Sequence, residues 1–310
     1  MISWILLAWV SLAAVLYGYN QYRFHEGEKR YPPNGQFVTV DGYKLHYLEK
    51  GTGKPVVFLH GGVLSADDFA DVLELTARQG YRAIAFDRPG YGHSERPRKE
   101  AVTPAVQARL IHDALQQLGV EKPVLVGHSW SGVLVLTYAL LYPADVAGIV
   151  TLGGAMYKEG YPAENGDPLS QVVTTPVIGS VLLHTLLHPL GSTLADGMLT
   201  ATFAPEPVPA DYRKRTKALL LRPEAFRANR EDVLAFPPAA QAVSARYKEI
   251  QQPVVIVVGA QDPFGTIAQA ERLHREIPHS QLLVLPAAAH MIPQHHPEQV
   301  VEAVNRIYEP

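Results

Sequence analysis

The sequence contains no cysteine among its 310 residues. This absence excludes a disulfide framework and a thiol nucleophile, and it says nothing about the compartment. Charged residues are also scarce, at 18%, and the formal net charge is −3. No basic surface for nucleic acid or acidic lipid is therefore expected. Internal repeats and low-complexity tracts are missing, and 47% of the residues are hydrophobic. One globular unit with a large core and an insertion is the expected organisation.

The N-terminal segment up to Tyr22 has no charged side chain, and Ile2–Tyr19 is almost continuously apolar. A helix of about 18 such residues would span about 27 Å, close to the thickness of a membrane's hydrocarbon core. We therefore predict a single-pass membrane anchor over residues 1–24, a linker over residues 25–36, and the membrane as a partner. A cleaved signal peptide, giving a secreted or periplasmic protein, is the alternative, and a buried or interfacial helix is a third. Basic residues after the apolar stretch favour a cytoplasmic folded domain, but the side of the membrane stays open.

Short apolar strands alternate with helical segments after residue 35. A hairpin is expected around Asp41-Gly42, between residues 36–40 and 43–49. Helices are expected near residues 67–79 and 104–118. The other predicted strands cover residues 56–59, 82–86, 123–126, 148–152, 253–258 and 281–285. This alternation predicts an α/β fold with a mostly parallel, eight-stranded sheet and helices on both faces.

Between residues 155 and 250 no strand pattern is found, and the segment is helical in pattern, broken into short pieces by prolines. We expect a helical cap over residues 155–250, inserted after the sixth strand. Residues 37–154 and 251–310 would form the core. The apolar run 177–187 predicts either the interior of the cap or the lining of a site for a lipophilic group.

Residues 127–132, Gly-His-Ser-Trp-Ser-Gly, stand between an apolar strand and an apolar helix. This is the context of a nucleophile elbow, a tight turn that exposes its serine above the sheet and admits only small neighbours. Ser129 occupies the position of the nucleophile. Ser131 replaces the second glycine of the G-x-S-x-G pattern and is a rival nucleophile. An ordinary turn with a capping serine is the alternative for the whole motif.

Asp262 and His290 follow Ser129 in chain order, each just past the end of an apolar strand. A serine hydroxyl is a poor nucleophile unless an imidazole accepts its proton, and the imidazole needs a carboxylate to fix its tautomer. We therefore expect a catalytic triad of Ser129, Asp262 and His290. Glu159, the nearest carboxylate after the sixth strand, is the alternative acid.

With these motifs the chain resembles an α/β-hydrolase-fold serine hydrolase with a cap domain, esterase- or lipase-like, over about residues 37–310. Two further motifs are similar to that family. His60-Gly61-Gly62 resembles its oxyanion loop, and residues 87–94 resemble the turn after its next strand. The resemblance implies that the backbone N–H groups of Gly62 and Trp130 form an oxyanion hole.

The expected reaction is hydrolysis of a small, lipophilic carboxylic ester through an acyl-enzyme on Ser129. Another triad hydrolase (a carbon–carbon bond hydrolase, lactonase, amidase or haloperoxidase-like enzyme) stays open, as does a non-catalytic ligand-binding protein. Serine argues against the dehalogenase and epoxide hydrolase branches of the fold, which attack through an aspartate. No cofactor or metal is expected, because His184 and His188 have no third ligand nearby in the sequence. The natural substrate and the oligomeric state stay open.

Overall fold

A computed structural model describes the backbone of residues 2–63 and 65–309. Its centre is one eight-stranded sheet with the strand order β1-β2-β4-β3-β5-β6-β7-β8. The first two strands pair antiparallel and the other six run parallel. The strands are β1 (Gln36–Val40), β2 (Tyr43–Lys50), β3 (Lys54–Leu59), β4 (Tyr81–Phe86), β5 (Val124–His128), β6 (Gly148–Leu152), β7 (Val254–Gly259) and β8 (Gln281–Leu285). The predicted mostly parallel, eight-stranded sheet is confirmed.

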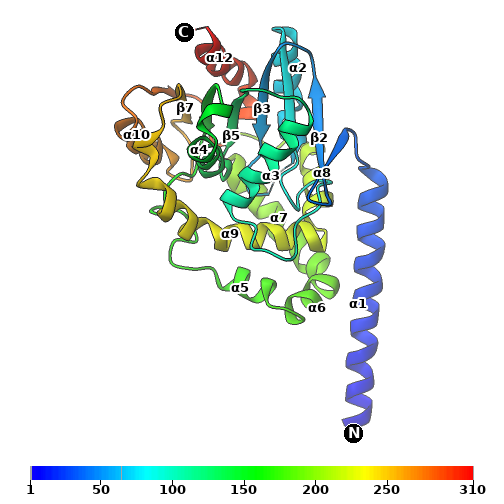
Figure 1. Ribbon diagram of the computed structural model, residues 1–310. Coiled ribbons are helices and arrows are strands. Elements are labelled where there is room, and N and C mark those ends of the chain that lie inside the picture. The colour runs from blue at the N-terminus through cyan, green and yellow to red at the C-terminus, as the bar shows by residue number, and fades with distance from the viewer. Residues whose placement is uncertain (1, 64, 310) are drawn as a thin grey trace.

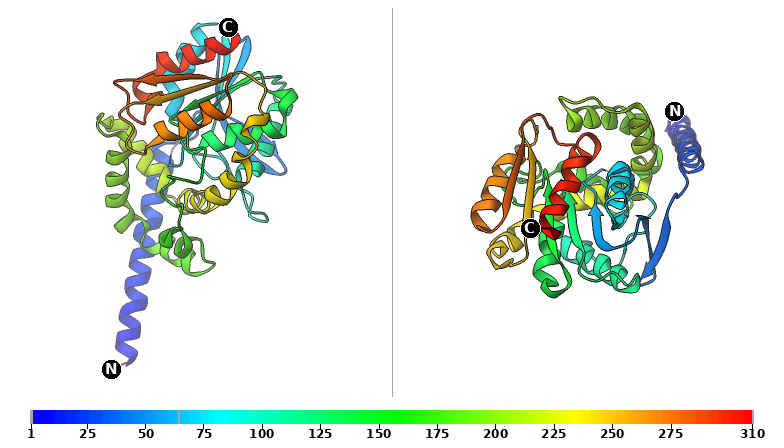
Figure 2. Two further views of the ribbon diagram at one scale, coloured as in Figure 1. Left: turned by 90° about the vertical axis from the view of Figure 1, so that its left-hand side faces the viewer. Right: turned by 90° about the horizontal axis from the view of Figure 1, so that it is seen from above.

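Helices cover both faces of this sheet (Figure 2). On one face lie α3 (Pro104–Gln117), α4 (Ser131–Leu141) and α10 (Thr266–Glu276), packed on strand residues such as Leu125. On the other lie α2 (Ala70–Arg78) and α12 (Pro297–Tyr308), packed on Val124 and Val126. Because successive side chains of a strand point to opposite faces, a strand buried on both sides is apolar throughout. Short helical turns complete this part of the chain: η1 (Ala66–Phe69), η2 (Pro143–Asp145), η3 (Tyr247–Glu249) and α11 (Ile292–His295).

Between β6 and β7 the chain forms a helical insertion (residues 155–250; Figure 1). Its helices are α5 (Pro168–Thr174), α6 (Ile178–Thr185), α7 (Leu187–Phe203), α8 (Ala210–Leu220) and α9 (Pro223–Ser244). The expectation that prolines divide the whole segment fails at α9, which continues through Pro237 and Pro238 over 22 residues. Proline costs a helix one backbone hydrogen bond, and burial of Phe236 and Ala240 on the same helix offsets that loss. In the apolar run 177–187, Leu183 is buried while Val177, Ile178 and Val181 are exposed.

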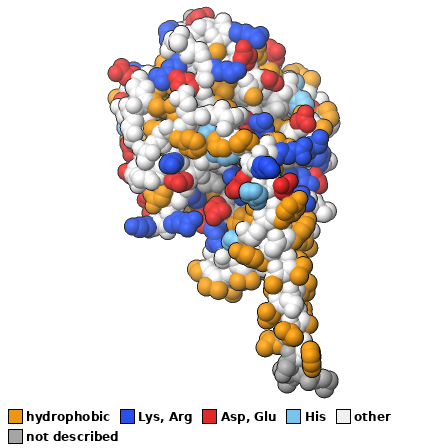
Figure 3. Space-filling view, turned by 90° about the vertical axis from the view of Figure 1, so that its right-hand side faces the viewer, with side chains coloured by type: hydrophobic (Ala, Val, Ile, Leu, Met, Phe, Trp, Pro, Cys, Tyr) orange, Lys and Arg blue, Asp and Glu red, His pale blue; other side chains and the backbone are white. Residues whose placement is uncertain are grey.

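The N-terminal helix α1 (Ile2–Arg30) projects from the body of the protein (Figure 1). It continues past residue 24, so the predicted linker is helical up to Arg30. Exposed apolar side chains cover its N-terminal part (Figure 3), including Trp4, Leu7, Trp9 and Val10.

The predicted membrane anchor is wrong. Within residues 4–63 and 65–309, no helix combines the length and the apolarity that crossing a membrane requires, and the first residues of the predicted span lie outside this described part. The length of α1 is sufficient, but Tyr17, Gly18 and Tyr19 dilute its apolar stretch, and the polar Asn20 and Gln21 follow directly. The predicted single-pass membrane location, and the membrane as a partner through this segment, lose their support with the anchor.

The C-terminal half of α1 instead packs on the helical insertion. Asn20 is fully buried; its amide donates to the carbonyl of Thr185 at 2.7 Å and accepts from the backbone N–H of His188 at 2.9 Å. Phe24 is also buried and contacts the His188 ring, with the centroids 5.3 Å apart. Burial lowers the pKa of His188 to about 4, which keeps this contact uncharged at neutral pH.

Replacing Asn20 tests this docking. Asn20→Ala leaves the partly buried carbonyl of Thr185 and the buried N–H of His188 without partners, so we expect the free energy of unfolding to fall by about 1–3 kcal/mol. Chemical denaturation would measure the change. The exposed His25 on the same helix provides the control, and His25→Ala should stay within about 0.5 kcal/mol of the parent. Equal stability of the two variants would show that α1 does not dock in solution.

Candidate active site

The chain adds β4 on one side of β3 and then crosses to add β5 on the other side, so the order of strand addition reverses at β3. At this switch point the turns that follow β3 and β5 are neighbours. Parallel strands bring their carboxyl ends to one edge, and a crevice forms there where the strand order reverses. Gly62 follows β3 and Ser129 follows β5. Asp262 and His290 follow β7 and β8 at the same edge.

Ser129 lies in a strained turn between β5 and α4. Its φ is +53°, in the left-handed region that a non-glycine residue rarely adopts. The backbone of the turn is held on both sides: the N–H of Ser129 donates to Leu152 and its carbonyl accepts from Gly132 and Ala155, each at 2.9 Å. A side chain at Gly127 would place its Cβ 2.4 Å from the carbonyl oxygen of Ser131, so only glycine fits there.

Ser129, His290 and Asp262 form a continuous hydrogen-bonded chain. The Oγ of Ser129 lies 3.0 Å from Nε2 of His290, and Nδ1 of His290 lies 2.7 Å from Oδ2 of Asp262. The side chains of His290 and Asp262 are only 5% and 1% exposed. A carboxylate only accepts hydrogen bonds, so Nδ1 carries a proton, and Nε2 is the nitrogen that can accept one from Ser129.

Two further donors keep the Asp262 carboxyl ionised. Thr266 donates its hydroxyl to Oδ2 at 2.6 Å, and the backbone N–H of Phe264 donates to Oδ1 at 2.8 Å. Burial alone would raise the pKa of Asp262, but His290 and these donors outweigh it and hold that pKa below its usual value. Sequence reasoning missed Thr266, although a threonine four residues after a candidate acid at a helix start is a usable signal.

His128 fixes the loop that carries His290. Its Nε2 donates to the backbone carbonyl of His290 at 2.9 Å, and the two rings lie 5.0 Å apart. Burial, together with the nearby His290 ring, lowers the pKa of His128 to about 3. A neutral imidazole protonated on Nε2 therefore holds this contact at neutral pH.

The structure places the rival residues elsewhere. Ser131 is fully buried in α4, and its hydroxyl donates to the carbonyl of His60 at 2.6 Å. Glu159 is mostly exposed and pairs with Arg272 at 3.2 Å rather than with His290. His184 and His188 lie against aromatic rings of α1. No cluster of three metal-ligating side chains occurs in the described part of the chain.

The residues of the expected oxyanion hole lie in the turns that follow β5 and β3. Trp130 is next in the chain after Ser129 and 2% exposed, while Gly62 comes from the turn after β3. The amide of Asn229 in α9 donates to the carbonyl of Gly62. Sequence reasoning did not single out Asn229, because it lies 167 positions away along the chain.

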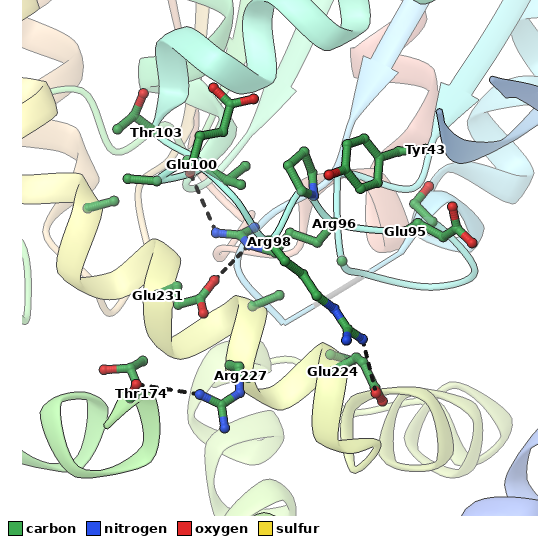
Figure 4. Close-up of a pocket in the computed structure, with 18 of the residues that line it drawn as sticks. Tyr43, Glu95, Arg96, Arg98, Glu100, Thr103, Thr174, Glu224, Arg227 and Glu231 are labelled. Carbon is green, nitrogen blue, oxygen red and sulfur yellow. Dashed lines mark hydrogen bonds and ion pairs between the residues drawn. The ribbon is translucent and has the colours of Figure 1, made fainter. Parts of the chain in front are cut away.

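A cavity of about 1660 Å³ lies away from these residues. Figure 4 shows that it separates the segment around residues 95–103 from α9, with Arg96 paired to Glu231 and Arg98 to Glu224 across it. Neither Ser129, Asp262 nor His290 lines this cavity. The mixed charges of this cavity therefore do not indicate the chemical class of a substrate that binds near Ser129.

Comparisons with known proteins agree with this architecture. A family model described as the alpha/beta hydrolase fold matches residues 54–175. The chain is 28% identical to a 2-hydroxy-6-oxononadienedioate/2-hydroxy-6-oxononatrienedioate hydrolase of Paraburkholderia phymatum, over 83% of this chain and 88% of that protein. It is 26% identical to a 2-hydroxy-6-oxo-6-phenylhexa-2,4-dienoate hydrolase of Burkholderia cepacia, over 88% and 94%. The esterase structure from Exiguobacterium antarcticum superposes with a TM-score of 0.72 at 24% identity, covering 89% of this chain and all of that one.

Reaction with a fluorophosphonate tests whether Ser129 is activated. The probe labels serines whose hydroxyl proton a neighbouring base accepts, so Ser129→Ala should abolish labelling. Ser131→Ala is the matched control and should retain most of it, since Ser131 is buried in the helix. In-gel fluorescence after a time course measures both rates. Strong labelling of Ser129→Ala would show that another residue is the nucleophile.

Proposed function

This chain is a hydrolase of the α/β-hydrolase fold, and we propose that it hydrolyses a carboxylic ester with Ser129 as nucleophile, His290 as general base and Asp262 as the acid that orients His290. The observation that carries the proposal is the hydrogen-bonded chain from Ser129 through His290 to Asp262. Its geometry suits proton transfer from the hydroxyl to the imidazole, with a buried carboxylate to stabilise the resulting cation.

In the proposed reaction Ser129 Oγ attacks the ester carbonyl as His290 Nε2 takes its proton. The backbone N–H groups of Gly62 and Trp130 would bind the oxyanion of the tetrahedral intermediate, and a donor of this kind typically lowers the barrier by about 3 kcal/mol. The N-terminus of α4, which begins at Ser131, adds a favourable dipole. His290 then protonates the leaving alcohol and activates water, which releases the acyl group from Ser129.

We also propose the division into a core of residues 37–154 and 251–310 and a cap of residues 155–250. Support comes from Asn229 on α9, whose amide reaches the carbonyl of Gly62. The helical insertion therefore contacts the turn proposed to bind the oxyanion. A cap in this place would contribute part of the substrate site and exclude water from it.

Cleavage of a carbon–carbon bond is the second candidate, favoured by the two relatives named as hydrolases of 2-hydroxy-6-oxo acids, which align over most of their length. The same serine would then attack the 6-oxo carbon, and the leaving group would be carbon rather than an alkoxide. A panel of p-nitrophenyl esters of increasing chain length, beside 2-hydroxy-6-oxo-6-phenylhexa-2,4-dienoate, separates the two. Turnover of the esters supports the first proposal, and turnover of the dienoate alone overturns it in favour of the second.

The acid is tested by Asp262→Asn. An amide in place of the carboxylate stabilises the wrong tautomer of His290, so kcat on the preferred substrate should fall by about 10⁴-fold. Glu159→Gln, which changes the rival carboxylate, should leave kcat within about twofold because Glu159 pairs with Arg272 on the surface. Steady-state kinetics and a circular dichroism spectrum of each variant complete the measurement. A near-normal Asp262→Asn beside an inactive Glu159→Gln would assign the acid to Glu159.

A further inference from the structure

Arg88, two residues beyond the end of β4, has a side chain that is 0% exposed. Its guanidinium donates to two successive carbonyl oxygens of the turn after β3: Nε to His60 at 3.0 Å and Nη2 to Gly61 at 2.9 Å. The planar fork of arginine allows this double contact, which a lysine ammonium cannot reproduce in the same way.

Two donors hold the carbonyl of Gly61, Nη2 of Arg88 at 2.9 Å and Nδ1 of His60 at 2.8 Å, and together they fix the direction of the next N–H group. In a trans peptide the C=O of one residue and the N–H of the following residue lie in one plane and point in opposite directions. Gly62 has no side chain to restrict its backbone, so the orientation of its N–H depends on what holds the Gly61 carbonyl. Together with His60, whose ring accepts from the backbone N–H of Arg88 at 2.9 Å, Arg88 therefore aims the N–H of Gly62 away from the guanidinium.

The same guanidinium also contacts Trp130. Its central carbon lies 4.2 Å from the centroid of the Trp130 ring. The indole N–H of Trp130 donates to the backbone carbonyl of Asp232 at 3.2 Å. Of the two residues expected to bind the oxyanion, Gly62 depends on Arg88 through the Gly61 carbonyl. Trp130 contacts Arg88 and donates to Asp232.

Asp232, on α9 of the helical insertion, holds Arg88 in place. Its Oδ2 accepts from Nη1 of Arg88 at 2.6 Å and from the hydroxyl of Tyr91 at 3.0 Å. Its Oδ1 accepts from Arg96 at 2.8 Å and from Gln107 at 3.0 Å. Burial would raise the pKa of Asp232, but Arg96 and Arg88 hold it below its usual value, so the carboxylate stays charged.

We propose that Arg88, anchored by Asp232, is a positioning residue for the oxyanion hole, and that through this pair the helical insertion controls the rate of the chemical step. The inference rests on the proposed serine-hydrolase function. An oxyanion forms only in the tetrahedral intermediate and the transition states on either side of it, so misaiming the N–H of Gly62 weakens those states and leaves substrate binding unchanged.

Arg88→Lys is the central variant. It keeps the buried positive charge but loses the fork, and we expect kcat on p-nitrophenyl butyrate to fall by about 10²-fold, as when an oxyanion donor is misplaced. KM should stay within about threefold, because ground-state binding does not use this N–H. The Asp232 side chain reaches the turn after β3 through Arg88 and, less directly, through Tyr91, whose ring contacts His60. Asp232→Asn should lower kcat by about 10-fold with the same unchanged KM.

Arg96→Lys is the matched control. Arg96 also pairs with Asp232, but its other hydrogen bonds go to Pro89, Val102 and Glu231 rather than to the turn after β3. Its kcat should stay within about threefold of the parent even if its stability falls. Where Arg88→Lys does not fold, Arg88→Met replaces it, since Asp232 keeps its partner Arg96, and the same loss of kcat is expected.

The affinity for a trifluoromethyl ketone distinguishes a positioning role of Arg88 from a purely structural one. The ketone adds to the serine and places a negative oxygen in the oxyanion hole, whereas the parent methyl ketone binds without addition. Affinity for the trifluoromethyl ketone should fall in proportion to kcat/KM in the Arg88 variants, and affinity for the methyl ketone should not.

Folded Arg88 variants with normal kcat, or with kcat and KM changed as in Arg96→Lys, would overturn the inference and leave the proposed function standing. A parent protein that neither hydrolyses the ester nor reacts with fluorophosphonate would overturn the proposed function, and this inference with it.

Discussion

The left-handed backbone of Ser129 is the constraint on which the site depends. A non-glycine residue in this conformation costs about 1–3 kcal/mol and persists only where its surroundings determine it. Here β5 and α4, both buried, fix the two ends of the turn, and Leu152, Gly132 and Ala155 hold its backbone. The strain lifts the hydroxyl to the edge of the sheet where His290 can reach it. The same crowding explains why Gly127 admits no side chain.

Buried charges supply a second level of order, and each is satisfied by several partners. Asp262 accepts from His290, Thr266 and the backbone of Phe264. Asp232 accepts from Arg88, Arg96, Tyr91 and Gln107 across the boundary between insertion and core. Such groups are costly to bury and much costlier to leave unpaired. They therefore specify one arrangement of the turns rather than many, and a site that must hold atoms within hydrogen-bond distance requires that specificity.

The apolar N-terminal stretch shows that an absence of charged residues is not enough to predict a membrane span. Its lack of charge suggested a membrane span, yet the determining residue is the polar Asn20, which the sequence pattern treats as the end of the apolar run. In the structure Asn20 is fully buried between α1 and the insertion. The Asn20 amide forms hydrogen bonds with a carbonyl and an N–H of the insertion. These bonds position α1 in addition to the burial of apolar area.

Local patterns in the sequence determined the sheet and the turns. Alternating apolar strands and helices predicted the mostly parallel sheet, because a strand buried on both faces must be apolar throughout. Small residues around Ser129 marked the strained turn, since side-chain bulk is excluded there by local sterics. The order of Asp262 and His290 after apolar strands placed them at the same edge of the sheet.

Only the tertiary structure brought Asp262 rather than Glu159 to His290, docked Asn20 on the insertion, and joined Arg88 to Asp232 across 144 positions of sequence. These contacts join segments far apart in the chain, and no local pattern encodes them. Whether a buried polar group finds its partner depends on how whole elements pack, and that is decided when the chain folds.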